Sequence, residues 1–274
     1  MLEDYGKGTL IIIGGAEDKK RECTILRKVV ELAGGSKARL VILTTATERP
    51  AEVGQEYAKI FRRLGVEDLE ILDIPDREMG QKESAVQIVE KAGAIFFTGG
   101  DQLRITSLLG GTALDEALHR VYKCGAVVAG TSAGASAMSA TMIVEGEGQE
   151  APKQNTVKMA PGMGLLDGVV IDQHFAQRGR LGRLLTAVAQ NPCILGIGLD
   201  EDTAIVVYSS GDFEVIGSQT VTIIDGEEIK HTNVSEIQTN QGLALTDVKL
   251  HVLPAGYGYS LQKRRPLEQR RFAE

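Results

Sequence analysis

Short apolar runs alternate, in the first half of the chain, with segments where apolar residues recur every three or four positions. The runs predict buried strands at residues 9–13, 39–43, 69–74, 94–98 and 126–129. The periodic segments between them predict amphipathic helices at residues 22–32, 51–64, 84–91, 103–109 and 113–122. Strands that are apolar on both faces and alternate with helices are typical of a parallel sheet covered on both sides.

The pattern changes after residue 140. Residues 141–168 contain Gly, Pro and Met with weak periodicity, which predicts a loop or lid. A strand is expected at 169–172, a helix at 181–189 and a further strand at 194–199.

The C-terminal part is rich in β-branched residues from residue 203 onward. Turn signals around Gly211 and at Asp225-Gly226 predict hairpins, and hence an antiparallel extension over about 203–262, followed by a solvated basic tail at 263–274. We therefore expect one α/β domain over residues 1–274, with a doubly wound, mostly parallel sheet and this β-rich extension.

Composition excludes several classes of protein. The 274 residues are 43% hydrophobic and 24% charged, which is typical of a globular protein. The formal net charge of −7 argues against nucleic-acid binding, which needs a basic face. No apolar stretch reaches the roughly 18 residues of a membrane span. The acidic N-terminus has no apolar signal core, so a cytoplasmic location is expected.

The three cysteines lack the spacing of a metal site or a disulfide framework. Cys23, Cys124 and Cys193 each lie among apolar residues, which predicts buried free thiols. We expect neither a metal ion nor another cofactor.

Glycine is unusually frequent, at 32 of 274 residues. Several glycines follow predicted strands, at Gly14-Gly15, Gly99-Gly100 and Gly130. The carboxyl ends of parallel strands form the ligand crevice of open α/β sheets. The glycines therefore indicate that the backbone approaches a ligand there.

The run Gly130-Thr131-Ser132-Ala133-Gly134 fits G-x-S-x-G and directly follows an apolar strand, which predicts a nucleophile elbow with Ser132 as the nucleophile. The Ala133 amide would then be an oxyanion donor, and the Gly100 amide a second one from the neighbouring strand end. The alternatives are a tight packing turn at Ser132 and a phosphate-binding turn at Gly99-Gly100. A nucleotide-binding module is disfavoured because neither glycine-rich nucleotide fingerprint is complete.

A serine nucleophile needs a base and an orienting carboxylate. His174 follows a predicted strand, where the crevice is expected. The other histidines are expected on a helix surface or in the β-rich region: His119, His231 and His251. Residues 200–202, Asp-Glu-Asp, close another strand, and alternation along the chain places Glu201 opposite its two neighbours. Which face meets His174 stays open at this point.

Four motifs in this order, GGDQ after AIFFT, GTSAGAS after AVVA, DQHF and GLDEDTA, resemble the cyanophycinases over nearly the whole chain. These serine exopeptidases are related to the aspartyl dipeptidase peptidase E and have the class I glutamine-amidotransferase-like fold. The resemblance implies a triad of Ser132, His174 and Glu201. It also implies a homodimer that cleaves cyanophycin, an arginine-bearing poly-aspartate, to β-aspartyl-arginine dipeptides. An α-aspartyl dipeptidase of the peptidase E type is the alternative.

Such a substrate presents guanidinium and carboxylate groups together. Acidic and amide side chains around the crevice could receive the guanidinium: Asp101, Gln102, Asp172 and Gln173. Arginines just after His174 suit carboxylate capture by forked hydrogen bonds: Arg178, Arg180 and Arg183. The alternatives are a helix N-cap for Asp101 and a solvated helix face for the arginines.

Overall fold

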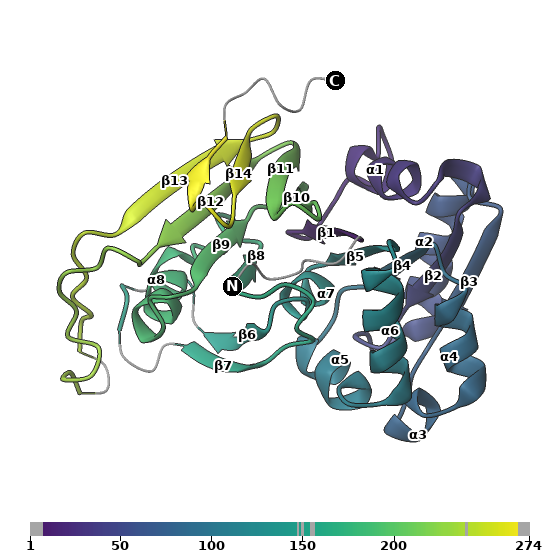
Figure 1. Cartoon of the computed structure of the whole chain (residues 1–274), viewed down its shortest axis with the longest axis horizontal. Coiled ribbons are helices and arrows are strands. Elements are labelled where there is room, and N and C mark those ends of the chain that lie inside the picture. The colour runs from purple at the N-terminus through teal and green to yellow at the C-terminus, as the bar shows by residue number, and fades with distance from the viewer. Residues whose placement is uncertain (1–7, 147, 149–150, 154–156, 239–240, 268–274) are drawn as a thin grey trace.

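The computed structural model describes residues 8–267 apart from 147, 149–150, 154–156 and 239–240 (Figure 1). Five parallel strands form one part of the larger sheet, in the order β1-β5-β4-β2-β3 with β3 at the edge. They are β1 (Thr9–Ile13), β2 (Arg39–Leu43), β3 (Asp68–Leu72), β4 (Ala94–Phe97) and β5 (Val127–Thr131).

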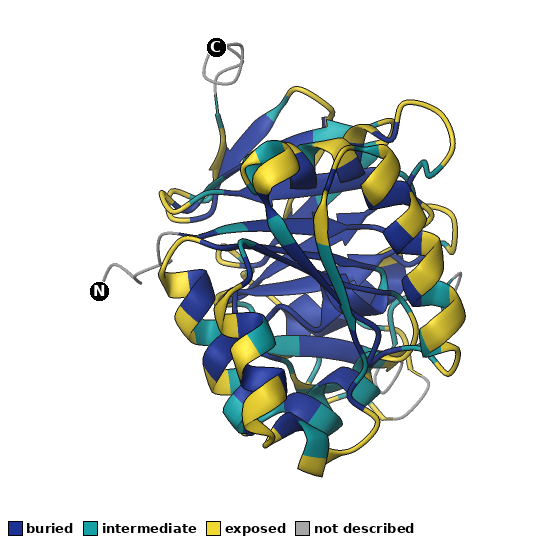
Figure 2. Cartoon of the chain, turned by 90° about the vertical axis from the view of Figure 1, so that its right-hand side faces the viewer, coloured by how far each residue is buried: buried dark blue, intermediate teal, exposed yellow. Residues whose placement is uncertain are grey.

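Helices cover both faces of these strands. They are α1 (Thr24–Leu32), η1 (Gly35–Lys37), α2 (Pro50–Arg63), α3 (Arg77–Gly80), α4 (Glu83–Glu90), α5 (Gln102–Leu109), α6 (Ala113–Lys123) and α7 (Ala133–Ser136). Alternation along β1 sends Ile11 and Ile13 into the core under α1 and α2, while Leu10 and Ile12 join the core under α4, α5 and α6. Figure 2 shows the result: buried strands lie between helices that expose only their outer faces.

The first elements end where the sequence predicts. Pro50 is the first residue of α2, a position where its missing amide hydrogen costs nothing. Gly65 follows that helix with φ of 98°, the left-handed conformation common just after a helix end.

Four antiparallel strands extend the larger sheet beyond β1. They are β10 (Thr203–Val207), β11 (Asp212–Gly217), β14 (Gly258–Ser260) and β15 (Arg265–Pro266), so that the full order is β15-β14-β11-β10-β1-β5-β4-β2-β3. The α/β class, the parallel strands between helices and the antiparallel C-terminal extension are confirmed.

A second sheet lies beside the first, on the left of Figure 1. Its strands, in the order β13-β12-β9-β8, are β8 (Val169–Gln173), β9 (Leu195–Leu199), β12 (Thr220–Asp225) and β13 (Lys249–Pro254). Only β8 and β9 are parallel to each other. The helix α8 (Leu181–Gln190) packs on β9 and β12. The C-terminal strands thus divide between two sheets rather than extending one.

Two predictions about the second half are wrong. The expected loop at 141–168 contains the antiparallel pair β6 (Thr141–Gly146) and β7 (Val157–Pro161), whose register shift between Ile143 and Glu145 weakens the alternation. Asp225-Gly226 ends β12 but closes no hairpin, because β12 pairs with β13, which begins only at Lys249. A turn signal therefore predicts where a strand ends but not which strand it pairs with.

Two further expectations are corrected. Cys124 and Cys193 are exposed, and only Cys23 is a buried thiol. The tail is not wholly solvated, since Arg264 forms an ion pair with the buried Asp225 at 2.5 Å; residues 268–274 lie outside the described part.

No helix among the described residues is long and apolar enough to cross a membrane.

Candidate active site

Ser132 occupies the sharp turn between β5 and α7. Its φ of 54° and ψ of −108° are sparsely populated for a residue with a side chain, and such backbone costs on the order of 1–3 kcal/mol. Its amide donates to the Ile13 carbonyl at 3.0 Å. A Cβ added at Gly134 would lie 2.7 Å from the Phe97 carbonyl oxygen. The turn therefore depends on close backbone packing, and it has the geometry of a nucleophile elbow.

The β4–α5 loop runs beside Ser132. Gly100 has φ of +148°, and a Cβ there would lie 2.1 Å from the Ala46 carbonyl oxygen. The Asp101 amide donates to that same oxygen at 2.9 Å, which holds the loop in place. Within the described chain, neither the Gly100 amide nor the Ala133 amide donates to a hydrogen bond. Both remain candidate oxyanion donors.

His174 lies directly after β8 and faces Ser132. Its Nε2 is 3.0 Å from the Ser132 Oγ, and its Nδ1 is 2.7 Å from a Glu201 carboxylate oxygen. The His174 amide donates to the Gly14 carbonyl at 2.8 Å. A Cβ at Gly15 would lie 2.4 Å from the imidazole ring. The two glycines after β1 thus hold the backbone of His174 and leave room for its ring.

Glu201 reaches His174 because β8 and β9 are parallel neighbours whose carboxyl ends meet. The adjacent carboxylates bond elsewhere: Asp200 accepts the Ala176 amide at 3.0 Å and the Thr220 hydroxyl at 2.7 Å, and Asp202 accepts the Asp18 amide at 2.8 Å. Glu201 points toward the imidazole and its two neighbours point into the surrounding loops, as the sequence predicts. The cause is a turn beyond the end of β9, in which Asp202 has φ of 50°, rather than a continued strand.

Burial lowers the pKa of His174 below its usual 6.5. It outweighs the hydrogen bond that His174 donates to Glu201, which raises this pKa, and the positive charge of Arg178 lowers it further. The imidazole is therefore mainly neutral at pH 7. With the Nδ1 hydrogen donated to Glu201, Nε2 is free to accept the Ser132 hydroxyl proton. This arrangement can generate a serine nucleophile.

The arginines after His174 do not share one environment. Arg183 forms a bidentate ion pair with the fully buried Asp172, and Arg180 reaches the same carboxylate at 3.3 Å. Arg180 also donates to the side chain of Gln173 at 2.6 Å, and burial lowers its pKa to about 10. Arg178 is exposed. Asp172 and Gln173 are thus occupied by arginines of the chain itself, and we no longer expect Asp172 to receive a substrate guanidinium.

The β4–α5 residues are also partly engaged. Asp101 caps α5 by accepting the Leu103 amide at 2.8 Å, as the N-cap alternative predicts. The side-chain amide of Gln102 donates to the Ile143 carbonyl at 2.9 Å and so links α5 to β6. We therefore no longer expect Gln102 to bind a substrate guanidinium. Arg178 and the exposed Asp101 remain available at the surface of the site.

Sequence reasoning missed Glu17, which lies four residues after the end of β1. It is only 4% exposed, and its two carboxylate oxygens accept the Thr131 hydroxyl at 2.6 Å and the Tyr57 hydroxyl at 2.5 Å. The sequence signal that could have found it is weak: Glu17 is a single acidic residue shortly after the Gly14-Gly15 pair that follows β1. The described residues contain no group of three or more His, Cys, Asp or Glu side chains placed to hold a metal ion.

The family model described as Peptidase family S51 matches residues 10–216. The chain belongs to this family. It is a serine peptidase of family S51, and its most similar curated relatives include a cyanophycinase of Geminocystis herdmanii, 41% identical over 97% of this chain and 98% of the relative. A cyanophycinase of a Nostoc species is also 41% identical, over 94% of this chain and 87% of its own.

Two solved structures share the fold. A peptidase from an acI-B1 Actinobacterium superposes with a TM-score of 0.70 at 21% identity, covering 94% of this chain and 98% of its own. A putative peptidase E from Listeria monocytogenes gives a TM-score of 0.51 at 17% identity, covering 76% of this chain and 96% of its own. The expected peptidase E-like fold is therefore confirmed.

Proposed function

We propose that the chain is a cyanophycinase that hydrolyses the poly-aspartate backbone of cyanophycin through an acyl-enzyme on Ser132. The observation that carries the proposal is the continuous chain of contacts from Ser132 Oγ to His174 Nε2, at 3.0 Å, and from His174 Nδ1 to Glu201, at 2.7 Å. The name and the coverage of the curated relatives support the choice of substrate.

In the first half-reaction, Ser132 attacks the scissile carbonyl carbon while His174 removes the hydroxyl proton. Glu201 holds the imidazole in the required tautomer and stabilises its positive charge. The amides of Gly100 and Ala133 are the candidate donors to the oxyanion. The C–N bond then breaks, and His174 transfers its proton to the departing amine.

In the second half-reaction, a water molecule attacks the acyl-enzyme and His174 removes the water proton. The C–O bond to Ser132 breaks, the serine oxygen takes back a proton from His174, and a β-aspartyl-arginine dipeptide leaves. Arg178, four residues after His174, and Asp101 are both exposed. They offer opposite charges to a substrate that carries both.

The test is mass spectrometry of the soluble products after incubation with insoluble cyanophycin. We expect β-aspartyl-arginine dipeptides from the earliest time points, and none with Ser132→Ala, which should still bind the polymer. Longer oligomers that appear first would contradict exopeptidase action.

An α-aspartyl dipeptidase is the second candidate, because the likeness to the putative peptidase E spans 76% of the chain. Cleavage of an α-aspartyl dipeptide without release of dipeptides from cyanophycin would replace the first proposal by this one. The homodimer and the cytoplasmic location stay predictions, and light scattering on the purified protein measures the first.

A further inference from the structure

Glu17 is a buried carboxylate that the proposed mechanism does not use. Burying a carboxylate is costly unless hydrogen-bond donors replace water. Here each oxygen receives one hydroxyl hydrogen, at 2.6 Å from Thr131 and 2.5 Å from Tyr57. Glu17 therefore bridges two elements that are distant in the sequence, the end of β5 and the helix α2.

Thr131 is the residue immediately before Ser132, and its side chain is buried. The strained backbone at Ser132 persists only if its surroundings hold it. Within the described chain, the side-chain hydrogen bond of Thr131 is the one to Glu17. This bond fixes the peptide that leads into the nucleophile.

Tyr57 is a rigid anchor at the other end of the bridge. Its ring packs against Phe96 of β4 with centroids 4.7 Å apart and against Phe61 at 6.4 Å. Burial, reinforced by the charge of Glu17, raises the pKa of Tyr57 well above its usual value. The phenol therefore keeps its hydrogen at every working pH and remains a donor to Glu17.

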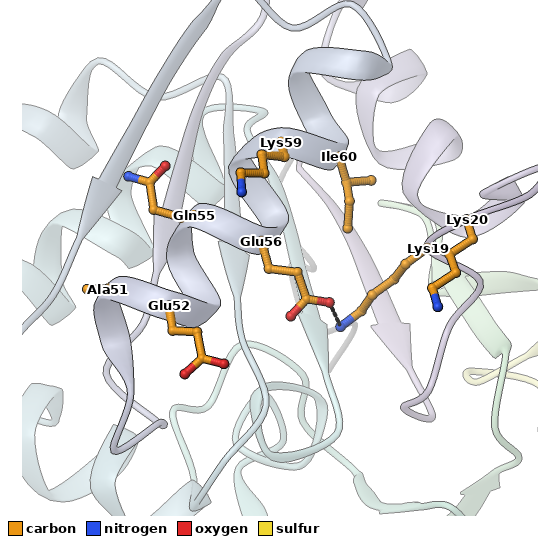
Figure 3. Close-up of a pocket in the computed structure, with 8 residues that line it drawn as sticks. All are labelled: Lys19, Lys20, Ala51, Glu52, Gln55, Glu56, Lys59 and Ile60. Atoms are coloured by element: carbon orange, nitrogen blue, oxygen red, sulfur yellow. Dashed lines mark hydrogen bonds and ion pairs between the residues drawn. The ribbon is translucent and has the colours of Figure 1, made fainter.

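The segment that carries Glu17 is clamped onto α2 from outside. The Lys19 ammonium lies 4.3 Å from the centre of the Tyr57 ring and 3.2 Å from the Glu56 carboxylate, toward which it points in Figure 3. Arg63, at the end of α2, donates to the Lys19 carbonyl at 2.6 Å. An open groove of about 680 Å³ lies outside these contacts, between Lys19 and α2.

The same segment also contacts the base side of the site. The Gly14 carbonyl accepts the His174 amide at 2.8 Å, and the Gly15 carbonyl accepts the Asp202 amide at 2.9 Å. A shift of the segment after β1 would therefore displace Ser132 and His174 relative to each other.

We infer that Glu17 is a positioning residue, whose bonds to Thr131 and Tyr57 hold the Ser132 turn so that its Oγ stays in hydrogen-bond reach of His174. The inference rests on the proposed function only in taking Ser132 as the nucleophile. It does not depend on the identity of the substrate.

Thr131→Val tests the bridge with almost no change of shape, because it replaces only the hydroxyl. A small uncharged fluorophosphonate that labels activated serines reports the reactivity of Ser132 without any natural substrate. Since displacements of about 1 Å can cost 10²-fold in rate, we expect labelling to slow by about 10- to 100-fold. On the natural substrate, kcat should fall by a similar factor with little change in KM. Thr131→Ser, which keeps the hydroxyl, should restore most of the rate.

Glu17→Gln and Tyr57→Phe test the other two members. A glutamine can still bond both hydroxyls, but without the charge that makes such bonds roughly twice as strong, so its loss should be smaller than that of Thr131→Val. Tyr57→Phe removes one donor and should also slow labelling. In all of these variants the midpoint of the pH dependence should stay at the wild-type value, because the contact between His174 and Glu201 is untouched.

The matched control is Glu52→Gln, which removes an exposed carboxylate from the same helix and breaks its ion pair with Arg49, away from the contacts that hold the Glu17 segment. We expect it to label at the wild-type rate. The melting temperature of each variant is measured first, and all labelling is then done well below the lowest of these temperatures. A wild-type rate in both Thr131→Val and Tyr57→Phe, or an equal loss in Glu52→Gln, overturns the inference. If the wild-type protein is not labelled at Ser132, the proposed function fails instead.

Discussion

The two sides of the candidate site are built by different means. The nucleophile side, from β4 and β5 of the larger sheet, depends on backbone packed so closely that a Cβ at Gly100 or Gly134 would collide with a neighbouring carbonyl group. The base side, from β8 and β9 of the second sheet, depends on buried charge. Asp172 pairs with Arg180 and Arg183, and the Asp200 carboxylate accepts hydrogen bonds from both the backbone amide and the hydroxyl of Thr220.

This difference predicts two kinds of sensitivity. The nucleophile side should fail when a small residue grows, because there is no space for added atoms. The base side should fail when a charged residue loses its partner, because the remaining buried charge is left uncompensated. Substitutions that are matched across the two sides can separate these effects.

The largest effect is expected from Glu201→Gln. The amide keeps the size of the side chain but can favour the wrong tautomer of His174, and in a serine triad such a change costs on the order of 10⁴ in kcat. Asp202→Asn is the matched control, because its carboxylate accepts the Asp18 amide and the Ser218 hydroxyl rather than the imidazole. Both are measured as kcat on folded protein. An equal loss in the two variants would mean that the Glu201 contact has no special part in orienting the base.

Gly100→Ala should have the next largest effect. The new methyl group would lie 2.1 Å from the Ala46 carbonyl oxygen and must push the loop, and with it the candidate oxyanion amide, away from Ser132. Losing one such donor costs about 10²- to 10³-fold in kcat.

Gly34→Ala is the control for the backbone effect alone. Gly34 also has a positive φ, +105°, but nothing lies within 4 Å of the position of an added Cβ. It should lower the melting temperature slightly and leave kcat unchanged. If Gly100→Ala behaves in the same way, the Gly100 amide does not take part in catalysis.

The nucleophile side could be predicted from sequence because its determinants are local. The strand, Ser132 and the two flanking glycines lie within eight residues, and the elbow requires that order. The strands β1, β2, β4 and β5 could also be placed to within one or two residues, because each is a short apolar run bounded by polar or glycine residues.

The base side could be predicted only in part. His174 and Glu201 were recognised as strand-end residues, but nothing local indicated that β8 and β9 form a separate sheet with β12. The arginines were expected to face a substrate, since a run such as Arg178 to Arg183 has the same composition whether its partner is a ligand or a buried Asp172. Contacts between residues far apart in the sequence determine these partners. The same holds for Thr131 and Glu17, which are 114 residues apart.

Asp172→Asn is expected to act through stability more than through chemistry. It leaves Arg180 and Arg183, which are 8% and 6% exposed, without their counter-charge, and breaking a buried pair costs about 3–5 kcal/mol. We expect a clear fall in the free energy of unfolding and a loss of about tenfold in kcat, because Gln173 and the His174 loop would shift.

Asp225→Asn is the matched control for Asp172→Asn. Asp225 is also buried and pairs with Arg264, but it lies at the far end of β12. Both substitutions should lower the free energy of unfolding in urea titrations, and only Asp172→Asn should lower kcat. A loss of stability without any loss of kcat in Asp172→Asn would show that the ion pair does not position the base.

Arg178→Gln should give the smallest effect, a shift in pH dependence. Activity requires neutral His174, so the rate falls as pH drops through the pKa of that histidine. Burial and then the charge of Arg178 both lower this pKa. Removing the charge should therefore raise it and move the acidic limb of the profile to higher pH. The readout is the pH at half-maximal labelling of Ser132 by the uncharged fluorophosphonate, which avoids any effect on substrate binding.

High salt should shift the wild-type profile in the same direction, since Arg178 is exposed and its field on His174 is screened. The salt effect should be weaker in Arg178→Gln. Arg62→Gln, which removes an exposed charge from the last turn of α2, is the control and should leave the midpoint in place. A midpoint that moves to lower pH in Arg178→Gln would mean that the arginine acts on the site through its contacts and not through its charge.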